Sequence, residues 1–350
     1  MNVSILLPNL NNRPYLEQRM ESIRAQTWGE WELIVMDGCS QDGAWEFFQA
    51  CAARDSRIKL YQSKERGIYN NFNKCIRLAR GEYVYFATSD DTMSPDALEK
   101  MATALEKNPE CDIAHCKLKI IDEKGGVSEE KSWDDFFIVK YFGNLIDRMH
   151  IRRAPHDGIL HFCGITVYTS LTQLLIRRRL FDRIGLFLAD FGPTADFEWE
   201  MRATLLAHTV HVPEYLATWR LHRDQATSAH TIHRAKAEGK FLKMADHAVR
   251  VARRFEPEMV KQFNMKELKY LLLKERLFHE VHLSRNPLRK YISGLKWLLV
   301  YPSLTGEFYK AGKSQNRFLS QEGFLGYIKE IIGKYGLEDH LVVKEVKQGA

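Results

Sequence analysis

Residues 81–91 read GEYVYFATSDD, and this stretch decides the expected fold. Its first half is apolar and aromatic, which is typical of a buried strand. The apolar run stops at Ser89, and two carboxylates, Asp90 and Asp91, follow at once. Open α/β sheets bind ligands at the carboxyl ends of their strands. Since Mg²⁺ is often held by one or two carboxylates and substrate phosphates, the acids favour a metal site; an ordinary solvated turn is the alternative.

The segments around this stretch alternate between strand and helix patterns. Apolar runs at residues 3–7, 31–36 and 58–61 predict three further strands. Helical patterns separate them, at residues 15–26, 44–54 and 69–80. Alternation of this kind predicts βαβ units and a mainly parallel sheet. The second strand also ends in an acid, Asp37, so two strand ends in one sheet favour a site for a cation or a sugar nucleotide.

Composition bounds the class of protein. The chain has 350 residues, of which 45% are hydrophobic and 27% charged, as in a globular protein with room for two domains. The six cysteines contain no CxxC pair, so we expect neither structural zinc nor a disulfide framework, and a reducing cytoplasm as the compartment. We expect no membrane-spanning run and no signal peptide.

The net charge of +6 is unevenly distributed. Residues 231–350 carry 23 Lys and Arg against 13 Asp and Glu, whereas residues 1–230 carry 28 against 32. Within this basic tail, residues 288–304 (LRKYISGLKWLLVYPSL) combine basic and aromatic side chains. Such a segment can lie on an anionic membrane, pack on the rest of the chain or form a dimer interface, and a solvated helical surface is the plainest alternative. Nucleic-acid binding is not expected, because the tail has no recognised motif.

A fourth acid stands at the start of a predicted helix. Residues 189–202 read ADFGPTADFEWEMR and place Asp196 just ahead of a helical pattern. A carboxylate at this position is often only a helix cap. It is also a placement that can present a general base to a cleft.

Six motifs in this order resemble the family 2 glycosyltransferases, which have the GT-A nucleotide-diphospho-sugar transferase fold. VSILLPNLN at residues 3–11 and WELIVMDGCSQDG at 31–43 are similar to the first two strands of the family with their turns. Residues 63–81 resemble the GIYDAMNKG-type segment of transferases that build bacterial surface polysaccharides, and residues 81–91 resemble the metal motif. Ala195-Asp196 and WRLHRDQATS at residues 219–228 resemble the catalytic pair and the closing motif.

The resemblance implies an α/β catalytic domain at residues 1–228, with a Rossmann-like, mainly parallel sheet flanked by helices. A basic, mainly helical region at 229–350 would serve acceptor, membrane or oligomer contacts. The implied enzyme is an inverting, metal-dependent, non-processive hexosyl- or N-acetylhexosaminyl-transferase. It would move a sugar from a nucleotide-diphosphate donor, with a UDP-sugar favoured, to a hydroxyl of a glycan or lipid-linked acceptor in bacterial polysaccharide or lipopolysaccharide biosynthesis.

Two other functions stay open at this point. One is a sugar-nucleotide-binding nucleotidyltransferase, although residues 8–13 (PNLNNR) lack the glycines of a phosphate loop. The other is a non-catalytic carbohydrate-binding protein. We expect a cytoplasmic protein, with peripheral contact on the inner face of an anionic membrane and a homo-oligomer as further possibilities.

The resemblance also implies a role for each site residue. Asp196 would be the general base that deprotonates the acceptor hydroxyl. Asp91 would bind Mn²⁺ or Mg²⁺, and His222 would complete that site. Asp37 would accept a hydrogen bond from the base, and Asp90 would face the ribose and donor sugar. The full set of residues implied to contact nucleotide or donor sugar is Pro8, Asn9, Leu10, Asp37, Arg66, Asn73, Ser89 and Asp90.

Four positions depart from the family pattern. Leu10 stands where an aromatic residue often stacks on the base, which predicts weaker base affinity. Thr88 replaces the first acid of the fuller metal motif and leaves Asp91 as the expected main anionic ligand. Asn70 replaces an Asp of the GIYDAMNK segment, and Ala195 replaces the frequent Glu before Asp196.

Overall fold

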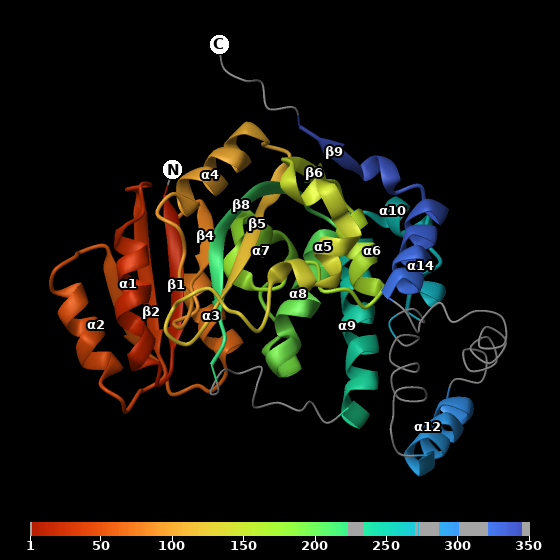
Figure 1. Cartoon of the computed structure of the whole chain (residues 1–350), viewed down its shortest axis with the longest axis horizontal. Coiled ribbons are helices and arrows are strands. Elements are labelled where there is room, and N and C mark those ends of the chain that lie inside the picture. The colour runs from red at the N-terminus through yellow and green to blue at the C-terminus, as the bar shows by residue number, and fades with distance from the viewer. Residues whose placement is uncertain (1, 223–233, 270–271, 273–286, 301–320, 345–350) are drawn as a thin grey trace.

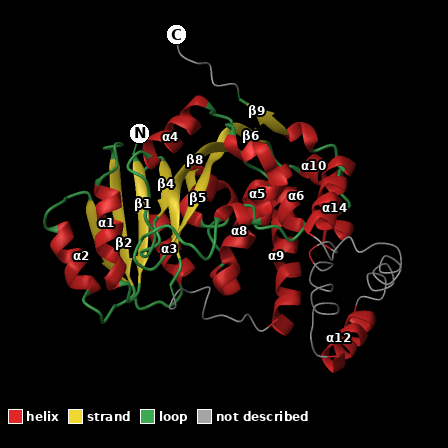
Figure 2. Cartoon of the chain, viewed as in Figure 1, coloured by secondary structure: helices red, strands yellow, loops and turns green. Residues whose placement is uncertain are grey.

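The computed structural model describes residues 2–222, 234–269, 272, 287–300 and 321–344 (Figure 1). Within these residues a central sheet is flanked by helices, with the strands running through the middle of the molecule (Figure 2). No helix in the described ranges combines the length and the apolar character that crossing a bilayer requires. The expected α/β architecture and the helical C-terminal region are both confirmed.

The described strands form one nine-stranded sheet in the order β3-β2-β1-β4-β7-β5-β8-β6-β9. Their bounds are β1 (Val3–Asn9), β2 (Trp31–Asp37), β3 (Ile58–Gln62), β4 (Tyr83–Phe86), β5 (Cys111–Ile121), β6 (His150–Arg152), β7 (Leu174–Arg177), β8 (His208–Arg220) and β9 (Leu341–Val343). The first four strands pair in parallel, as the alternating pattern predicts. Beyond them the sheet is mixed, because β7 is antiparallel to both β4 and β5, and β6 is antiparallel to both β8 and β9.

The helices that surround the sheet follow the predicted positions in the first half of the chain. Their bounds are α1 (Leu16–Arg24), α2 (Ala44–Ala52), α3 (Ile68–Leu78), α4 (Ala97–Lys107), α5 (Phe137–Phe142), α6 (His156–Phe162), α7 (Arg179–Ile184), α8 (Ala195–Thr204), α9 (Arg234–Phe255), α10 (Pro257–Lys261), α12 (Pro287–Val300) and α14 (Gln321–Lys334). Helix α3 packs on β1 and β2, and α4 packs on β5 and β8. Helix α8 packs between α6 and α9.

Strand direction brings four loops to one edge of the sheet. Strand β1 is parallel to β2 and β4, and the two antiparallel pairings through β7 return β5 to the same direction. Strand β8 is parallel to β5, so it also runs in this direction. The carboxyl ends of β1, β2, β4 and β8 therefore point to the same edge, which is where a doubly wound sheet binds its ligands.

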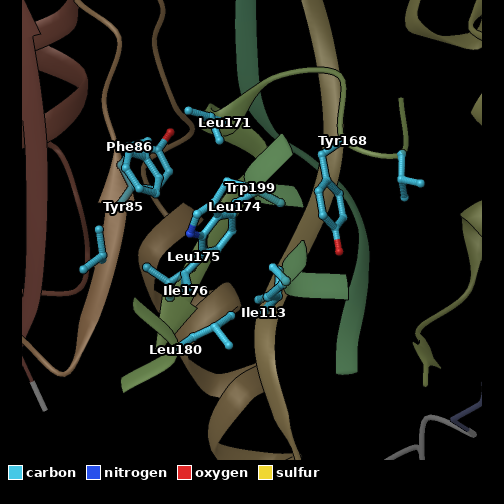
Figure 3. Packing of buried hydrophobic residues seen from close by; sticks show 14 of the residues in the cluster. Tyr85, Phe86, Ile113, Tyr168, Leu171, Leu174, Leu175, Ile176, Leu180 and Trp199 are labelled. Atoms are coloured by element: carbon cyan, nitrogen blue, oxygen red, sulfur yellow. The ribbon is translucent and has the colours of Figure 1, made fainter. Parts of the chain in front are cut away.

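An aromatic core joins this edge to α8 (Figure 3). Phe86 at the end of β4 packs edge to face on Phe72 of α3, with ring centroids 4.9 Å apart. Trp199 of α8 stacks on Phe181 of α7 at 4.7 Å, and its indole N–H donates to the carbonyl of Gly185 at 3.0 Å. Since buried aromatic pairs and a satisfied indole fix orientation, the N-terminus of α8 is held rigidly relative to β4.

A buried group of histidines lies between β5, β6 and β8. Nδ1 of His115 is 3.1 Å from Nδ1 of His211, and the His150 ring centroid is 4.8 Å from that of His211. Beside them Arg152 forms a fully buried ion pair with Asp157 at 2.7 Å. Burial lowers the pKa of all three imidazoles, and the neighbouring Arg152 cation adds to the effect. These rings are therefore neutral at physiological pH.

Helix α9 and strand β9 of the C-terminal region pack onto the rest of the chain. Helix α9 lies along α8, and His247 of α9 approaches buried Glu198 of α8 with Nδ1 and Oε1 2.7 Å apart. Strand β9 pairs with β6 as the last strand of the sheet, in the register His150 to Val343. The boundary expected at residue 228 falls in a stretch outside the described residues, as do residues 223–228 of the closing motif.

Candidate functional site

The turn after β2 is tied to the end of β1 by the Asp37 carboxylate. Asp37 is buried and accepts hydrogen bonds from Nδ2 of Asn9 at 3.0 Å, from Oγ of Ser40 at 2.6 Å and from the backbone N–H of Ser40 at 2.9 Å. The register of the parallel pair puts Asn9 directly opposite Asp37. Because an ionised carboxylate has about four acceptor positions, these three bonds leave room for about one more donor.

The neighbouring residues expected at the nucleotide lie on both sides of this turn. Pro8 is buried in β1, whereas Leu10 is 56% exposed just after it. A Cβ on Gly38 would lie 3.2 Å from Cδ1 of Leu10 and 3.3 Å from the carbonyl oxygen of Asn9, so a side chain there would press on the loop. Arg66 is exposed ahead of α3.

The end of β4 carries the outward-facing acid. Ser89 is buried, and its Oγ accepts a hydrogen bond from Nδ2 of Asn12 at 2.7 Å, which joins the β4 end to the loop after β1. Oδ2 of Asp90 lies 3.0 Å from Nε2 of His222, which follows β8. The Asp90 side chain is 20% exposed, and the His222 ring packs on Tyr15 with centroids 4.8 Å apart. The structure thus brings together two residues that the sequence assigned to separate roles.

Asp91 points into the protein. Its Oδ1 accepts the backbone N–H of Arg220 at 2.7 Å, and its Oδ2 accepts the hydroxyl of Thr88. Burial and the negative charge of Asp90 raise the pKa of Asp91 to about 7, against these hydrogen bonds and the cation of Arg19. Arg19 is itself fully buried in α1, with its guanidinium 5.7 Å from the centroid of the Tyr85 ring. Asp91 is 2% exposed and both of its oxygens accept internal hydrogen bonds, so Asp90 is the more exposed of the two acids.

The fourth acid, Asp196, stands in the first turn of α8. Its Oδ1 accepts the backbone N–H of Phe197 at 2.8 Å, and its carboxylate also accepts the hydroxyl of Tyr69 from α3. Burial raises the pKa of Asp196 above its ordinary value, and the bonds from Tyr69 and Phe197 oppose that rise. One turn deeper, burial and the charge of Asp196 raise the pKa of Glu200 well above its ordinary value. The two acids thus differ in burial, because Asp196 is partly exposed and Glu200 is buried.

Asn73 was expected near the nucleotide or sugar. Its side-chain amide instead forms hydrogen bonds with the backbone of the protein. Nδ2 donates to the carbonyl of Phe187 at 2.8 Å, and Oδ1 accepts the N–H of Phe187 at 3.0 Å. Since Phe187 lies in the segment between α7 and α8, this two-way bond fixes α3 to that segment. The Tyr69 ring also packs on Phe187, with centroids 5.2 Å apart.

The arrangement supplies two ligand atoms for a cation. Within the described ranges no group of three or more His, Cys, Asp or Glu side chains is arranged to hold a metal ion. Asp90 and His222 nevertheless present a carboxylate oxygen and an imidazole nitrogen 3.0 Å apart at the loop edge. This donor set fits Mg²⁺ or Mn²⁺ bound in part by the oxygens of a diphosphate, because such ions often take only one or two side chains.

One protein-family model matches this chain. Residues 4–181 match the model of glycosyl transferase family 2. The chain belongs to this family. The match spans β1 to α7 and so contains Asp37, Asp90 and the turns that hold them.

Curated relatives of this family 2 chain include bacterial proteins. A Mycobacterium tuberculosis protein is 26% identical over 220 residues, which is 62% of this chain and 66% of that protein. TuaG of Bacillus subtilis, named for teichuronic acid biosynthesis, is 37% identical over 99 residues, 28% of this chain and 39% of TuaG. EpsE of the same organism, also named as a glycosyltransferase, is 34% identical over 125 residues, 35% of this chain and 45% of EpsE. The matches thus span between 39% and 66% of these relatives.

Solved structures extend the fold likeness to the whole chain. S. aureus TarS 1–349 has a TM-score of 0.60, and its complex with UDP has 0.57. Each is 14% identical, and each alignment covers 100% of this family 2 chain and 98% of TarS 1–349. At this identity the likeness supports the GT-A fold, which confirms the expected fold class.

Several residues that shape the family 2 site were not singled out from the sequence. Asn12 had no special signal, because it acquires its partner from a distant part of the chain. Tyr69 had a signal, since it is the tyrosine of the GIYDAMNKG-type segment at residues 63–81. Arg19 had one, since it is a charged residue between apolar Leu16 and Met20 on the buried side of a predicted helix. Ser40 lay inside the Asp-Gly-x-Ser signature, and its bonds to Asp37 explain that serine.

Proposed function

We propose that the chain is an inverting, metal-dependent, non-processive glycosyltransferase. It would transfer a sugar from a nucleotide-diphosphate donor, with a UDP-sugar favoured, to a hydroxyl of a glycan or lipid-linked acceptor in polysaccharide or lipopolysaccharide biosynthesis. The observation that carries the proposal is the gathering of Asp37, Asp90 and His222 at one sheet edge, with Asp196 held near it through α3. The complexes of TarS with UDP and UDP-GlcNAc support the choice of a uridine donor.

Donor binding is assigned to the loop edge. The nucleobase would donate an N–H to the remaining acceptor position of Asp37, beside Pro8 and Asn9. Exposed Leu10 and Arg66 would flank the nucleotide, and Ser89 would lie near the ribose. We leave Asn73 out of direct contact, because both polar atoms of its amide are bonded to Phe187.

The cation is assigned to Asp90 and His222 in place of Asp91. Asp90 is the more exposed acid and lies 3.0 Å from the histidine, whereas both oxygens of Asp91 accept internal hydrogen bonds. When bound, Mn²⁺ or Mg²⁺ would neutralise charge on the departing diphosphate. Asp91 would hold the loop in place by fixing Thr88 and the backbone of Arg220.

Asp196 is assigned as the general base. Its carboxylate would take the proton of the acceptor hydroxyl while the oxygen attacks the anomeric carbon and the bond to the diphosphate breaks. A single displacement of this kind inverts the configuration and requires one base and no covalent nucleophile. The hydrogen bond from Tyr69 keeps the base oriented and favours its ionised form.

The proposal is tested first by ligand binding. A thermal-shift screen of UDP, GDP and dTDP with Mn²⁺ or Mg²⁺ should raise the melting temperature most for UDP with metal, since a ligand stabilises the state that binds it. Hydrolysis or transfer of labelled sugar from a panel of UDP-sugars then identifies the donor. If no nucleoside diphosphate shifts the melting temperature at saturating concentration, the proposal fails.

A further inference from the structure

Helix α12 (Pro287–Val300) presents a continuous apolar face. Its large side chains Leu288, Tyr291, Ile292, Leu295, Leu298 and Leu299 are exposed, from 43% at Leu295 to 80% at Leu299. They recur at spacings of three and four residues, which places them on one face of a helix. Figure 1 shows α12 standing apart from the sheet and from the ends of α9 and α14.

This face differs from the other exposed apolar side chains in the described residues. Those others are Leu10, Tyr61, Ile68, Leu78, Val127 and Tyr215; they are scattered, and the two that share an element, Ile68 and Leu78, stand at opposite ends of α3. Scattered apolar side chains are normal on a protein surface, whereas a contiguous set marks an interaction site. We therefore expect a binding partner to cover the apolar face of α12.

The charge of the segment indicates what that occupant is. The sequence has no Asp or Glu between Glu280 and Glu307, and in that interval it has Arg285, Arg289, Lys290 and Lys296. A surface that complements it must be apolar at its boundary and negatively charged. Two copies of the helix would bring basic residues together with no acid in the segment to pair with them, so self-association is disfavoured.

We propose that α12 binds the surface of an anionic lipid bilayer, lying in the plane of the interface with its apolar face among the acyl chains. A helix of 14 residues is about 21 Å long, shorter than the roughly 30 Å hydrocarbon core, so it lies on the bilayer and does not span it. Apolar area and attraction of basic residues to anionic headgroups both contribute to such binding. The inference does not rest on the proposed transferase activity, because it uses no residue of the sheet edge.

Vesicle flotation with the full chain tests the proposal. At low salt the chain should float with vesicles of phosphatidylcholine containing about one-quarter phosphatidylglycerol and remain at the bottom with phosphatidylcholine alone. Raising the salt should weaken the binding, because screening reduces the attraction to anionic headgroups. An Asp196→Asn variant should float as the wild type does, which separates membrane binding from catalysis.

Two single substitutions provide the matched comparison. Leu299→Glu places an acid on the apolar face, and Val127→Glu makes the same kind of change at a side chain that is 68% exposed on a distant loop. The first should lower the partition coefficient at least about tenfold, since a leucine leaves the acyl boundary and a like charge meets the anionic lipid. The second should leave it unchanged. Circular dichroism and thermal melting confirm that both variants fold.

Three outcomes would overturn the proposal. The chain could stay unbound with anionic vesicles at low salt. It could float equally well with Leu299→Glu. Finally, sedimentation equilibrium could show a wild-type dimer that Leu299→Glu dissociates, with no vesicle binding by either form; a second copy of the chain would then be the occupant of the face.

Discussion

Nε2 of His222 lies 3.0 Å from Oδ2 of Asp90, although 132 residues separate them in the chain. The contact joins the carboxyl end of β8 to that of β4, and it places a carboxylate oxygen and an imidazole nitrogen side by side at the loop edge.

Removing either member of the pair should weaken metal-dependent nucleotide binding. Asp90→Asn and His222→Ala should each lower the affinity for UDP in the presence of Mn²⁺ at least about tenfold, or about 1.4 kcal/mol. Binding without metal should change little. Isothermal titration calorimetry with and without Mn²⁺ measures both quantities. Asp182→Asn, which changes an exposed acid on α7, is the control, and equal wild-type affinity with and without metal would remove the cation from this site.

The two acids of α8 should respond differently to the loss of their charge. Asp196→Asn should lower the turnover of sugar transfer about 10²- to 10⁴-fold, the contribution typical of a general base, and keep UDP affinity. Glu200→Gln should retain most of the turnover, because burial and the charge of Asp196 already favour the uncharged acid at Glu200. Steady-state kinetics on a shared donor compare the two. Similar losses in both variants would argue against Asp196 as the base.

Tyr69→Phe should change the pH dependence of transfer. The Tyr69 hydroxyl donates to Asp196 and so lowers the pKa of that carboxyl, which burial otherwise raises. Without the bond the pKa of Asp196 rises, the base is protonated at a higher pH, and the acidic limb of kcat/KM moves upward by about one pH unit. Tyr61→Phe, on the exposed side of β3, serves as the control. An unchanged acidic limb would separate Tyr69 from the base.

Asn73→Ala should lower the free energy of unfolding. The substitution leaves the N–H and the carbonyl of Phe187 without their buried partner, which costs about 2–4 kcal/mol of unfolding free energy. Urea denaturation measures that loss, and UDP titration of the folded variant should give nearly wild-type affinity. A large loss of UDP affinity with unchanged stability would instead return Asn73 to the donor site, as the sequence suggested.

Stability should fall in mild acid because of the buried imidazoles. Burial lowers the pKa of His150 to about 4 and of His161 to about 3, so only the unfolded chain takes up protons as the pH falls below about 6.5. Each such histidine then removes up to about 1.4 kcal/mol of stability per pH unit. Denaturation curves measured between pH 7.5 and 5 should show the unfolding free energy falling by up to about this amount per histidine for each pH unit.

One variant isolates a single histidine of this group. The His161 ring packs edge to face on Phe197, with centroids 5.2 Å apart, so His161→Phe fits the local packing. The slope of stability against pH should become shallower by up to about 1.4 kcal/mol per pH unit in this variant. If wild type and variant lose stability in parallel, His161 does not contribute to the acid response.

The sequence predicted the loop edge well because that edge follows from strand direction alone. Buried runs that end in Asn9, Asp37 and Ser89 had to bring these residues to one side of a parallel sheet. It could not predict which of the paired acids faces outward. Asp91 is buried because Arg220, from a strand much later in the chain, donates its N–H to it.

The other features that the sequence did not predict also depend on contacts between distant parts of the chain. Asn73 looked available for a ligand, but its amide is occupied by a backbone 114 residues away. Strand β6 was not predicted, because it is only three residues long and owes its place to pairing with β8 and β9. Short strands of this kind carry little pattern of their own.

Strand β9 gives the order of synthesis a structural consequence. Until residues 341–343 leave the ribosome, β6 has a partner on one side only, and its other edge is open to pairing with any extended chain nearby. The turns after β1, β2 and β4 are made some 250 residues earlier, and β8, which completes the loop edge, ends some 120 residues earlier. A nascent chain would therefore complete its loop edge well before β9 covers the open side of β6, and that side is exposed to non-native pairing in the interval.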